Sequence, residues 1–130
     1  MASSGEASAI RPDPRADGAL VTKAVLRAAG RLALANKELA RILGLSESTL
    51  SRMGGGGYVL MPGQKPYELA LLLVRLYRSL DSVVGGDAAA AKAWLRADNI
   101  ALGATPLARI VSIAGLTETI AYLDARRALV

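Results

Sequence analysis

The sequence contains no cysteine, no histidine and no phenylalanine, and it has one tryptophan and four tyrosines. Without cysteine the chain forms no disulfide, and the common zinc and haem sites lose their usual ligands. We therefore predict that the protein holds no metal and no cofactor. The absence of cysteine also agrees with a reducing compartment, and we predict a cytoplasmic protein.

Long hydrophobic runs are missing as well. The most apolar run, residues 69–80, is interrupted by Arg75 and Arg78 and is far shorter than a bilayer span. The first eighteen residues lack the apolar core of a signal peptide, and their Pro, Ser and Asp content is typical of a solvated chain. We predict no membrane segment and a disordered tail over residues 1–18.

Strand patterning and catalytic constellations are also absent. Hydrophobic residues make up 52% of the chain, yet alanine, leucine and valine dominate them, and no sustained alternation of apolar and polar residues occurs. We therefore predict an all-α fold with a core of small and aliphatic side chains. No carboxylate pair stands beside a candidate serine or threonine nucleophile, so we predict no catalytic residues and no enzymatic activity.

Positive charge is concentrated in the first half of the chain. Nine of the 16 basic residues but only five of the 11 acidic residues lie in residues 1–65. A helix predicted over residues 19–35 carries Lys23, Arg27 and Arg31 at four-residue spacing, on one face. That row is either a solvated helix face or a surface that lies across phosphates.

Residues 36–53 have the spacing of a helix-turn-helix unit. Asn36 can cap a first helix, Gly44 breaks it, and Ser46 begins a second helix. Small or apolar residues occupy the inward positions of this pattern: Ala40, Leu45, Leu50 and Met53. The alternative is a helical hairpin that never contacts DNA. On the DNA-binding interpretation, the outward residues of the second helix are the contacts: Ser46, Glu47, Ser48, Ser51 and Arg52.

Four consecutive glycines follow, at residues 54–57. We interpret residues 54–66 as a linker that is mobile unless it packs through Tyr58, Val59 and Leu60. A phosphate-binding loop is disfavoured, because no phosphate-loop signature follows a predicted strand. The predicted domains are therefore 19–65, a helix-turn-helix domain with its glycine-rich linker, and 66–130.

The helix that Pro66 opens is apolar over much of its girth. Leucines form an apolar stripe along one side of this helix, and Leu71, Val74 and Tyr77 add apolar side chains on another side. The helix must therefore be buried on more than one side. A dimer seam is one way to cover the second side. We therefore predict a homodimer whose interface contains Leu69, Leu72, Leu73 and Leu76.

Helix boundaries are well marked in the last part of the chain. Asp87 can cap a helix that follows Gly85-Gly86, and Thr105-Pro106 can open another. We expect that helix to end at Gly115 in a left-handed cap, and Thr117 to begin a final helix.

One order of residues in this stretch is specific: Trp94-Leu95, Asn99, Leu102-Gly103, Pro106-Leu107, Gly115 and Tyr122-Leu123-Asp124. From about Pro66 onward the sequence resembles the toxin-binding domain of the Xre/MbcA/ParS antitoxins, and it is most similar to the ParS-type partners of RES-domain toxins. It departs from them at Gly103-Ala104, where two glycines are usual, and at a tail without glycine.

The resemblance implies an antitoxin of a type II toxin-antitoxin system. Its partner would be a RES-domain toxin that consumes NAD or transfers ADP-ribose from it, and the antitoxin would also bind operator DNA. The end of the chain would block the toxin's active site, which makes the predicted toxin-binding residues Arg126, Arg127, Ala128, Leu129 and Val130. The alternative is a stand-alone helix-turn-helix repressor without a protein partner.

Overall fold

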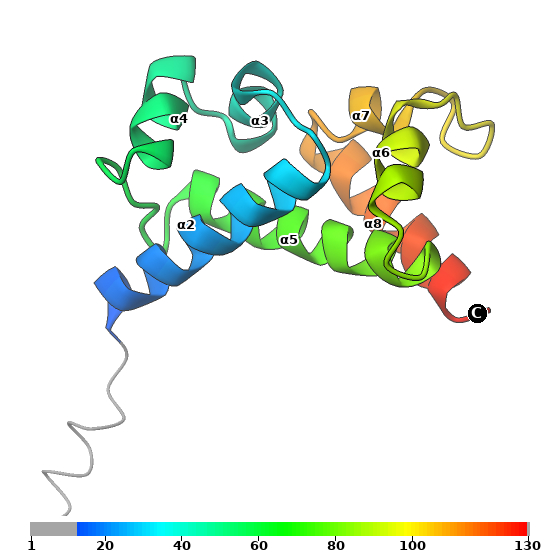
Figure 1. Ribbon diagram of the computed structural model, residues 1–130, viewed down its shortest axis with the longest axis horizontal. Coiled ribbons are helices and arrows are strands. Elements are labelled where there is room, and N and C mark those ends of the chain that lie inside the picture. The colour runs from blue at the N-terminus through cyan, green and yellow to red at the C-terminus, as the bar shows by residue number, and fades with distance from the viewer. Residues whose placement is uncertain (1–12, 130) are drawn as a thin grey trace, which may run out of the picture.

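The computed structural model describes residues 13–129. Within that range the chain is helical and contains no strand, so the predicted all-α fold is confirmed. Figure 1 shows the helices. They are α2 (Pro14–Arg31), α3 (Asn36–Leu43), α4 (Glu47–Gly54), α5 (Lys65–Val83), α6 (Ala88–Arg96), α7 (Pro106–Arg109) and α8 (Ile113–Arg127).

Helix α5 is the axis of the molecule. It packs against α2 on one side and α8 on another, and it also touches α3 and α6. In Figure 1 the helix-turn-helix pair α3 and α4 lies over one end of α5, while α6, α7 and α8 gather at the other end. The hydrophobic core is continuous between the two ends, because α5 contributes to both.

Helix α2 begins earlier than predicted. The Asp13 carboxylate accepts a hydrogen bond from the Arg15 N–H at 3.1 Å, and Pro14 occupies the first helical position, where no N–H is needed. Residues 14–18 are therefore helical, and the predicted disordered tail was wrong for them. The rest of that prediction, residues 1–12, lies outside the described residues.

The helix-turn-helix prediction agrees closely with the structure. Gly44 adopts the left-handed conformation with φ of +71° at the end of α3, and the predicted inward residues Ala40, Leu50 and Met53 are buried. One detail differs, because Ala35 and not Asn36 is the cap residue of α3. The Glu38 carboxylate accepts the Ala35 N–H at 2.9 Å and so satisfies the free donor of this turn.

The linker after the glycines is packed against α2. Leu60 is buried, and its N–H donates to the Thr22 hydroxyl at 2.9 Å. A side chain at Gly18 would overlap the Leu60 carbonyl oxygen, so only glycine allows this approach. The sequence predicts a mobile linker unless residues 58–60 pack against the rest of the chain. Leu60 does pack, so the linker is fixed at that residue.

The burial of α5 corrects part of the predicted dimer interface. Leu73 and Leu76 are fully buried in the core of a single chain, so they are not available to a second copy. Helix α8 covers the second apolar side of α5, which the sequence analysis assigned to a partner. Leu69 and Leu72 are half-buried, whereas Leu71 on the same helix is 41% exposed.

The final helices start partly as predicted. The Thr105 hydroxyl caps α7 by accepting the Ala108 N–H at 3.2 Å. The predicted end at Gly115 was wrong, because α7 stops at Arg109 and Ser112 caps α8. Gly115 lies inside the first turn of α8, where a side chain would overlap the Arg109 carbonyl. Thr117 caps nothing, since its hydroxyl donates to carbonyls of the preceding turn within α8.

Candidate functional site

Helix α4 presents the predicted DNA-contacting residues at the surface. All five are exposed, namely Ser46, Glu47, Ser48, Ser51 and Arg52. Ser46 has a structural task as well, because its hydroxyl accepts the Thr49 N–H at 3.1 Å as the helix cap. Its remaining hydrogen-bonding capacity is shared with the neighbouring hydroxyls of Ser48 and Thr49. Arg52 is the only cation in α4.

The Arg52 guanidinium is held in place by two neighbours. It donates to the Thr49 hydroxyl at 3.2 Å, and it lies over the Tyr58 ring at 5.6 Å from the centroid. Such contacts limit the rotamers of a long side chain before any ligand arrives. From the sequence, Tyr58 is predicted only to pack within the linker. An aromatic residue directly after four glycines was the signal that could have placed it beside α4.

A second exposed group gathers where α8 leaves the core. Leu123 is the last buried position, and after it the Arg126 guanidinium donates to the Tyr122 hydroxyl at 2.8 Å and lies over that ring. The Tyr122 ring in turn stacks on Trp94, with centroids 6.3 Å apart and planes 19° from parallel. Arg126 is therefore supported by an aromatic pair that joins α6 to α8.

The predicted toxin-binding residues that the structure describes lie together at this end. Arg126, Arg127, Ala128 and Leu129 are all exposed, and Leu129 is 83% exposed. Val130 lies outside the described residues. Figure 1 shows the last turn of α8 at one end of the molecule. This turn and the two residues after it carry two cations and one large apolar side chain.

The sequence analysis missed two exposed apolar residues in this half of the molecule. Ile100 is fully exposed at the tip of a turn closed by the backbone bridge between Asn99 and Ala104, and Ile113 is 58% exposed at the start of α8. Nothing in the local sequence marks Ile100 as exposed, because Ala101, Leu102 and Ala104 make most of the turn apolar. Single exposed apolar side chains occur on most protein surfaces, so these two residues do not by themselves mark a contact surface.

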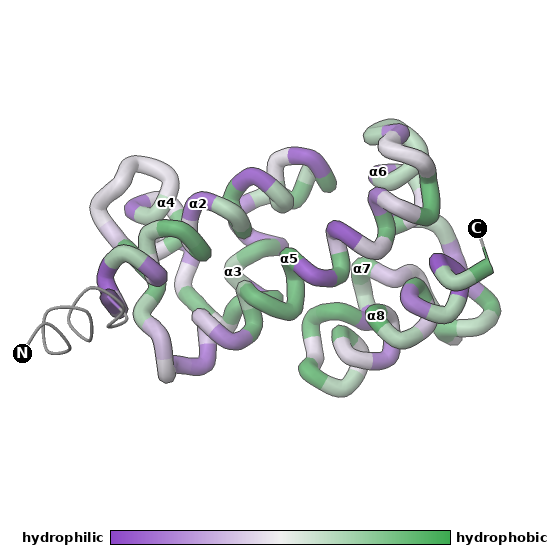
Figure 2. The backbone as a smooth tube through the Cα atoms, turned by 90° about the horizontal axis from the view of Figure 1, so that it is seen from below, coloured by the Kyte–Doolittle hydropathy of each residue, from purple (hydrophilic) through white to green (hydrophobic). Residues whose placement is uncertain are grey.

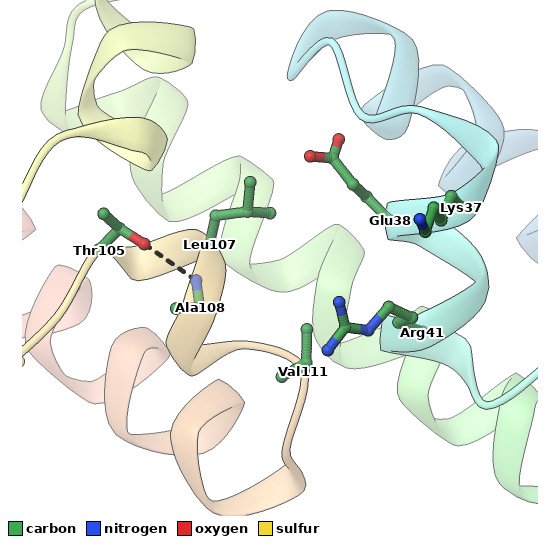
Figure 3. A pocket seen from close by; sticks show the side chains of 7 residues that line it. All are labelled: Lys37, Glu38, Arg41, Thr105, Leu107, Ala108 and Val111. Atoms are coloured by element: carbon green, nitrogen blue, oxygen red, sulfur yellow. Dashed lines mark hydrogen bonds between the residues drawn. The ribbon is translucent and has the colours of Figure 1, made fainter.

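A groove of about 420 Å³ separates the helix-turn-helix unit from α7 (Figure 3). Lys37 and Arg41 of α3 form one wall, and Leu107 and Val111 form the other. Glu38, which also lines the groove, pairs with Arg96 of α6 at 3.0 Å.

A partly exposed polar link also joins α5 to α8. The Asp124 carboxylate accepts the Ser79 hydroxyl at 2.6 Å and the Arg75 guanidinium at 2.8 Å. The Ser79 hydrogen bond is the largest cause that lowers the pKa of Asp124 from its ordinary value. Desolvation opposes it, and the hydrogen bond and charge of Arg75 and the charge of Arg127 lower the pKa further. The charged form of Asp124 is thereby favoured close to the end of α8.

The fold joins a helix-turn-helix unit to a second helical unit through α5. Two family models match the chain: the antitoxin Xre-like helix-turn-helix domain over residues 11–75, and the antitoxin Xre/MbcA/ParS C-terminal toxin-binding domain over residues 79–128. The chain belongs to the Xre/MbcA/ParS-type antitoxins. Comparison with curated proteins finds no match.

The second description is of a toxin-binding domain, so a toxin is a partner of this chain. The two matched ranges meet inside α5, whereas the sequence analysis set the boundary between residues 65 and 66, before that helix. In residues 13–129 no helix is long and apolar enough to cross a membrane.

Proposed function

We propose that this antitoxin inhibits a RES-domain toxin, which consumes NAD or transfers ADP-ribose from it, by placing its carboxy-terminal end in the toxin's active site. The observation that carries this proposal is the exposed tip of α8. The tip extends past Leu123, the last buried residue, and it presents Arg126, Arg127 and Leu129 outward.

The chemistry of this tip suits a pocket that binds a dinucleotide. Guanidinium groups pair with carboxylates or donate to carbonyl oxygens of a pocket wall, and an apolar side chain fills the space of a ring. Two arginines in the last turn also offset the negative end of the helix dipole, which favours the helical form of the tip. The tip therefore enters the partner as a preformed helix end, at a lower entropic cost than a flexible tail.

The second proposed activity is operator binding by α4. The exposed Arg52, prearranged by Tyr58, is suited to reading a guanine edge, while the short serine side chains contact phosphates or base edges. Because one α4 offers few specific contacts, we propose that a homodimer reads two half-sites and represses the antitoxin's own operon in the cytoplasm.

The test is inhibition by the full chain of the RES-domain toxin encoded beside it. NAD consumption by the purified toxin is measured with increasing antitoxin, and we expect complete inhibition at saturation. Leu129→Asp should raise the antitoxin concentration needed for half inhibition by at least tenfold, about 1.4 kcal/mol, because a carboxylate would enter an apolar site. Ser48→Ala, on the opposite end of the molecule, is the matched control. A toxin that stays active at saturation with the full chain contradicts the proposal.

A further inference from the structure

The outer face of α2 carries an apolar strip that no described part of the chain covers. Leu20 is 69% exposed, and it borders a groove of about 550 Å³ between α2 and α5. Val21, Ala24, Leu71 and Val74 line the same groove, together with the cations Arg75, Arg78 and Arg127. Figures 1 and 2 show α2 along one side of the molecule, with no other described helix over its outer face. An exposed strip of this kind marks a contact with another protein surface.

Charges on α2 are separated along its length. On the face that carries Leu20, Asp13 and Asp17 lie at the amino end, and Lys23, Arg27 and Arg31 lie towards the carboxyl end. At 100° per residue these side chains project from the same half of the helix as Leu20, opposite the buried residues Gly18, Thr22 and Val25. Arg15, also at the amino end, projects from a different side of the helix. Among the described residues, none of the five charges on the Leu20 face forms an ion pair.

This arrangement is complementary to itself. If a second α2 lies antiparallel across the first, with the two-fold axis level with Thr22, Asp17 faces the partner's Arg27 and Asp13 faces the partner's Arg31. In the same register Leu20 meets the partner's Ala24, a large side chain against a small one. The helix dipoles are then antiparallel, which is also favourable. A parallel arrangement would instead place like charges opposite each other.

We propose that the occupant of this face is a second copy of the chain, bound through an antiparallel contact between the two α2 helices. The inference rests on the proposed homodimer and gives it a surface in place of the buried Leu73 and Leu76. Nucleic acid fits the face less well, because it would explain the three cations but neither the exposed Leu20 nor the two carboxylates.

The first experiment measures the dimer dissociation constant by analytical ultracentrifugation. Leu20→Asp should raise it about 30-fold or more, because Leu20 lies at the centre of the contact. Ile100→Asp is the matched control, a charge in place of an exposed aliphatic residue far from α2, and it should leave the constant unchanged. Circular dichroism confirms that both variants fold.

The second experiment tests the register by charge reversal. Asp17→Arg and Arg27→Asp should each weaken self-association, since each places like charges opposite one another twice per dimer. Mixing the two variants should restore a dimer of wild-type affinity, because every opposed pair is again of opposite sign. Restoration on mixing supports the antiparallel contact, and failure to restore it overturns the contact.

The remaining outcomes separate this inference from the proposed function. A wild-type dimer that Leu20→Asp leaves intact overturns the α2 surface while the homodimer stands. If that variant instead loses only the toxin complex, the face belongs to the toxin. A wild-type chain that is monomeric at every concentration removes both the homodimer and its surface. If Arg27→Asp weakens operator binding without changing self-association, the row of cations serves DNA and the inference fails.

Discussion

Arg96 of α6 forms an ion pair with Glu38 of α3, with 3.0 Å between Nη2 and Oε1. The same guanidinium donates to the carbonyl oxygens of Leu32 at 3.2 Å and Ala33 at 2.9 Å. These carbonyls belong to the turn between α2 and α3, where Ala33 has a φ of +56°. One side chain of the toxin-binding half therefore satisfies the free carbonyls at the entrance of the helix-turn-helix unit.

Arg96→Ala should lower the free energy of unfolding by about 1–2 kcal/mol. Two hydrogen bonds from a charged group to backbone carbonyls are lost, while the ion pair itself contributes little because both side chains are about a third exposed. Urea denaturation measures the change. Lys92→Ala removes an exposed cation from the same helix and should change stability by less than about 0.5 kcal/mol. Equal effects of the two substitutions would show that Arg96 does not join the two halves.

Gly18→Ala should destabilise the protein by about 1–3 kcal/mol, because the added methyl group overlaps the Leu60 carbonyl and must push the linker away from α2. Gly30→Ala is the control within the same helix, and nothing lies near its added methyl group. It should be neutral or stabilising by up to about 1 kcal/mol, because alanine is the better helix former. Thermal unfolding of both variants measures the difference. Similar melting temperatures would mean that the linker is not packed at Leu60.

The low pKa of Asp124 gives stability a defined pH dependence. The folded chain holds Asp124 ionised because Ser79 and Arg75 donate to it, so the unfolded chain binds the proton at a higher pH. The contribution is fully present above the ordinary pKa of 3.8 and is lost as pH falls through the lower folded value. Between about pH 5 and about pH 3 the wild-type protein should lose more unfolding free energy than Asp124→Asn. Ser79→Ala should reduce the difference, and parallel pH profiles for all three proteins would rule out this link.

Arg52→Ala should weaken operator binding. If Arg52 contacts a phosphate, the slope of log affinity against log salt should fall by about 1. If it contacts a base, the sequence preference should relax. Lys92→Ala, an exposed cation on α6, should leave both quantities unchanged. Tyr58→Ala should have a smaller effect than Arg52→Ala, because it removes only the support of the guanidinium. Electrophoretic retardation at several salt concentrations gives all three values. Equal losses for Arg52 and Lys92 would remove α4 as the recognition helix.

The sequence predicted those parts of the fold that depend on neighbours in the chain. Ser46, Asp87 and Thr105 cap helices where their hydroxyl or carboxylate precedes an apolar run, and Gly44 ends α3 because its conformation is a local property. Periodicity also placed Leu50 and Met53 correctly, since one face of a short helix must be buried.

The errors arose where a residue's role depends on contacts outside its own helix. Gly115 looks like a helix end in sequence, but its small size serves contact with the Arg109 carbonyl. Leu73 and Leu76 look like a dimer seam, because periodicity shows that a face is buried and does not show that α8 covers it. The support of Arg126 by Tyr122 and Trp94 likewise joins residues of two helices, which spacing alone does not reveal.

The most direct test of the central proposal is deletion of residues 127–130 followed by measurement of the toxin's NAD consumption. These residues follow the last buried position, Leu123, so the shortened chain should keep the melting temperature and operator affinity of the full chain. The proposal predicts that the shortened chain no longer inhibits the toxin, even in large excess. Inhibition equal to that of the full chain would contradict it and would assign neutralisation to the surface between Trp94 and Leu123.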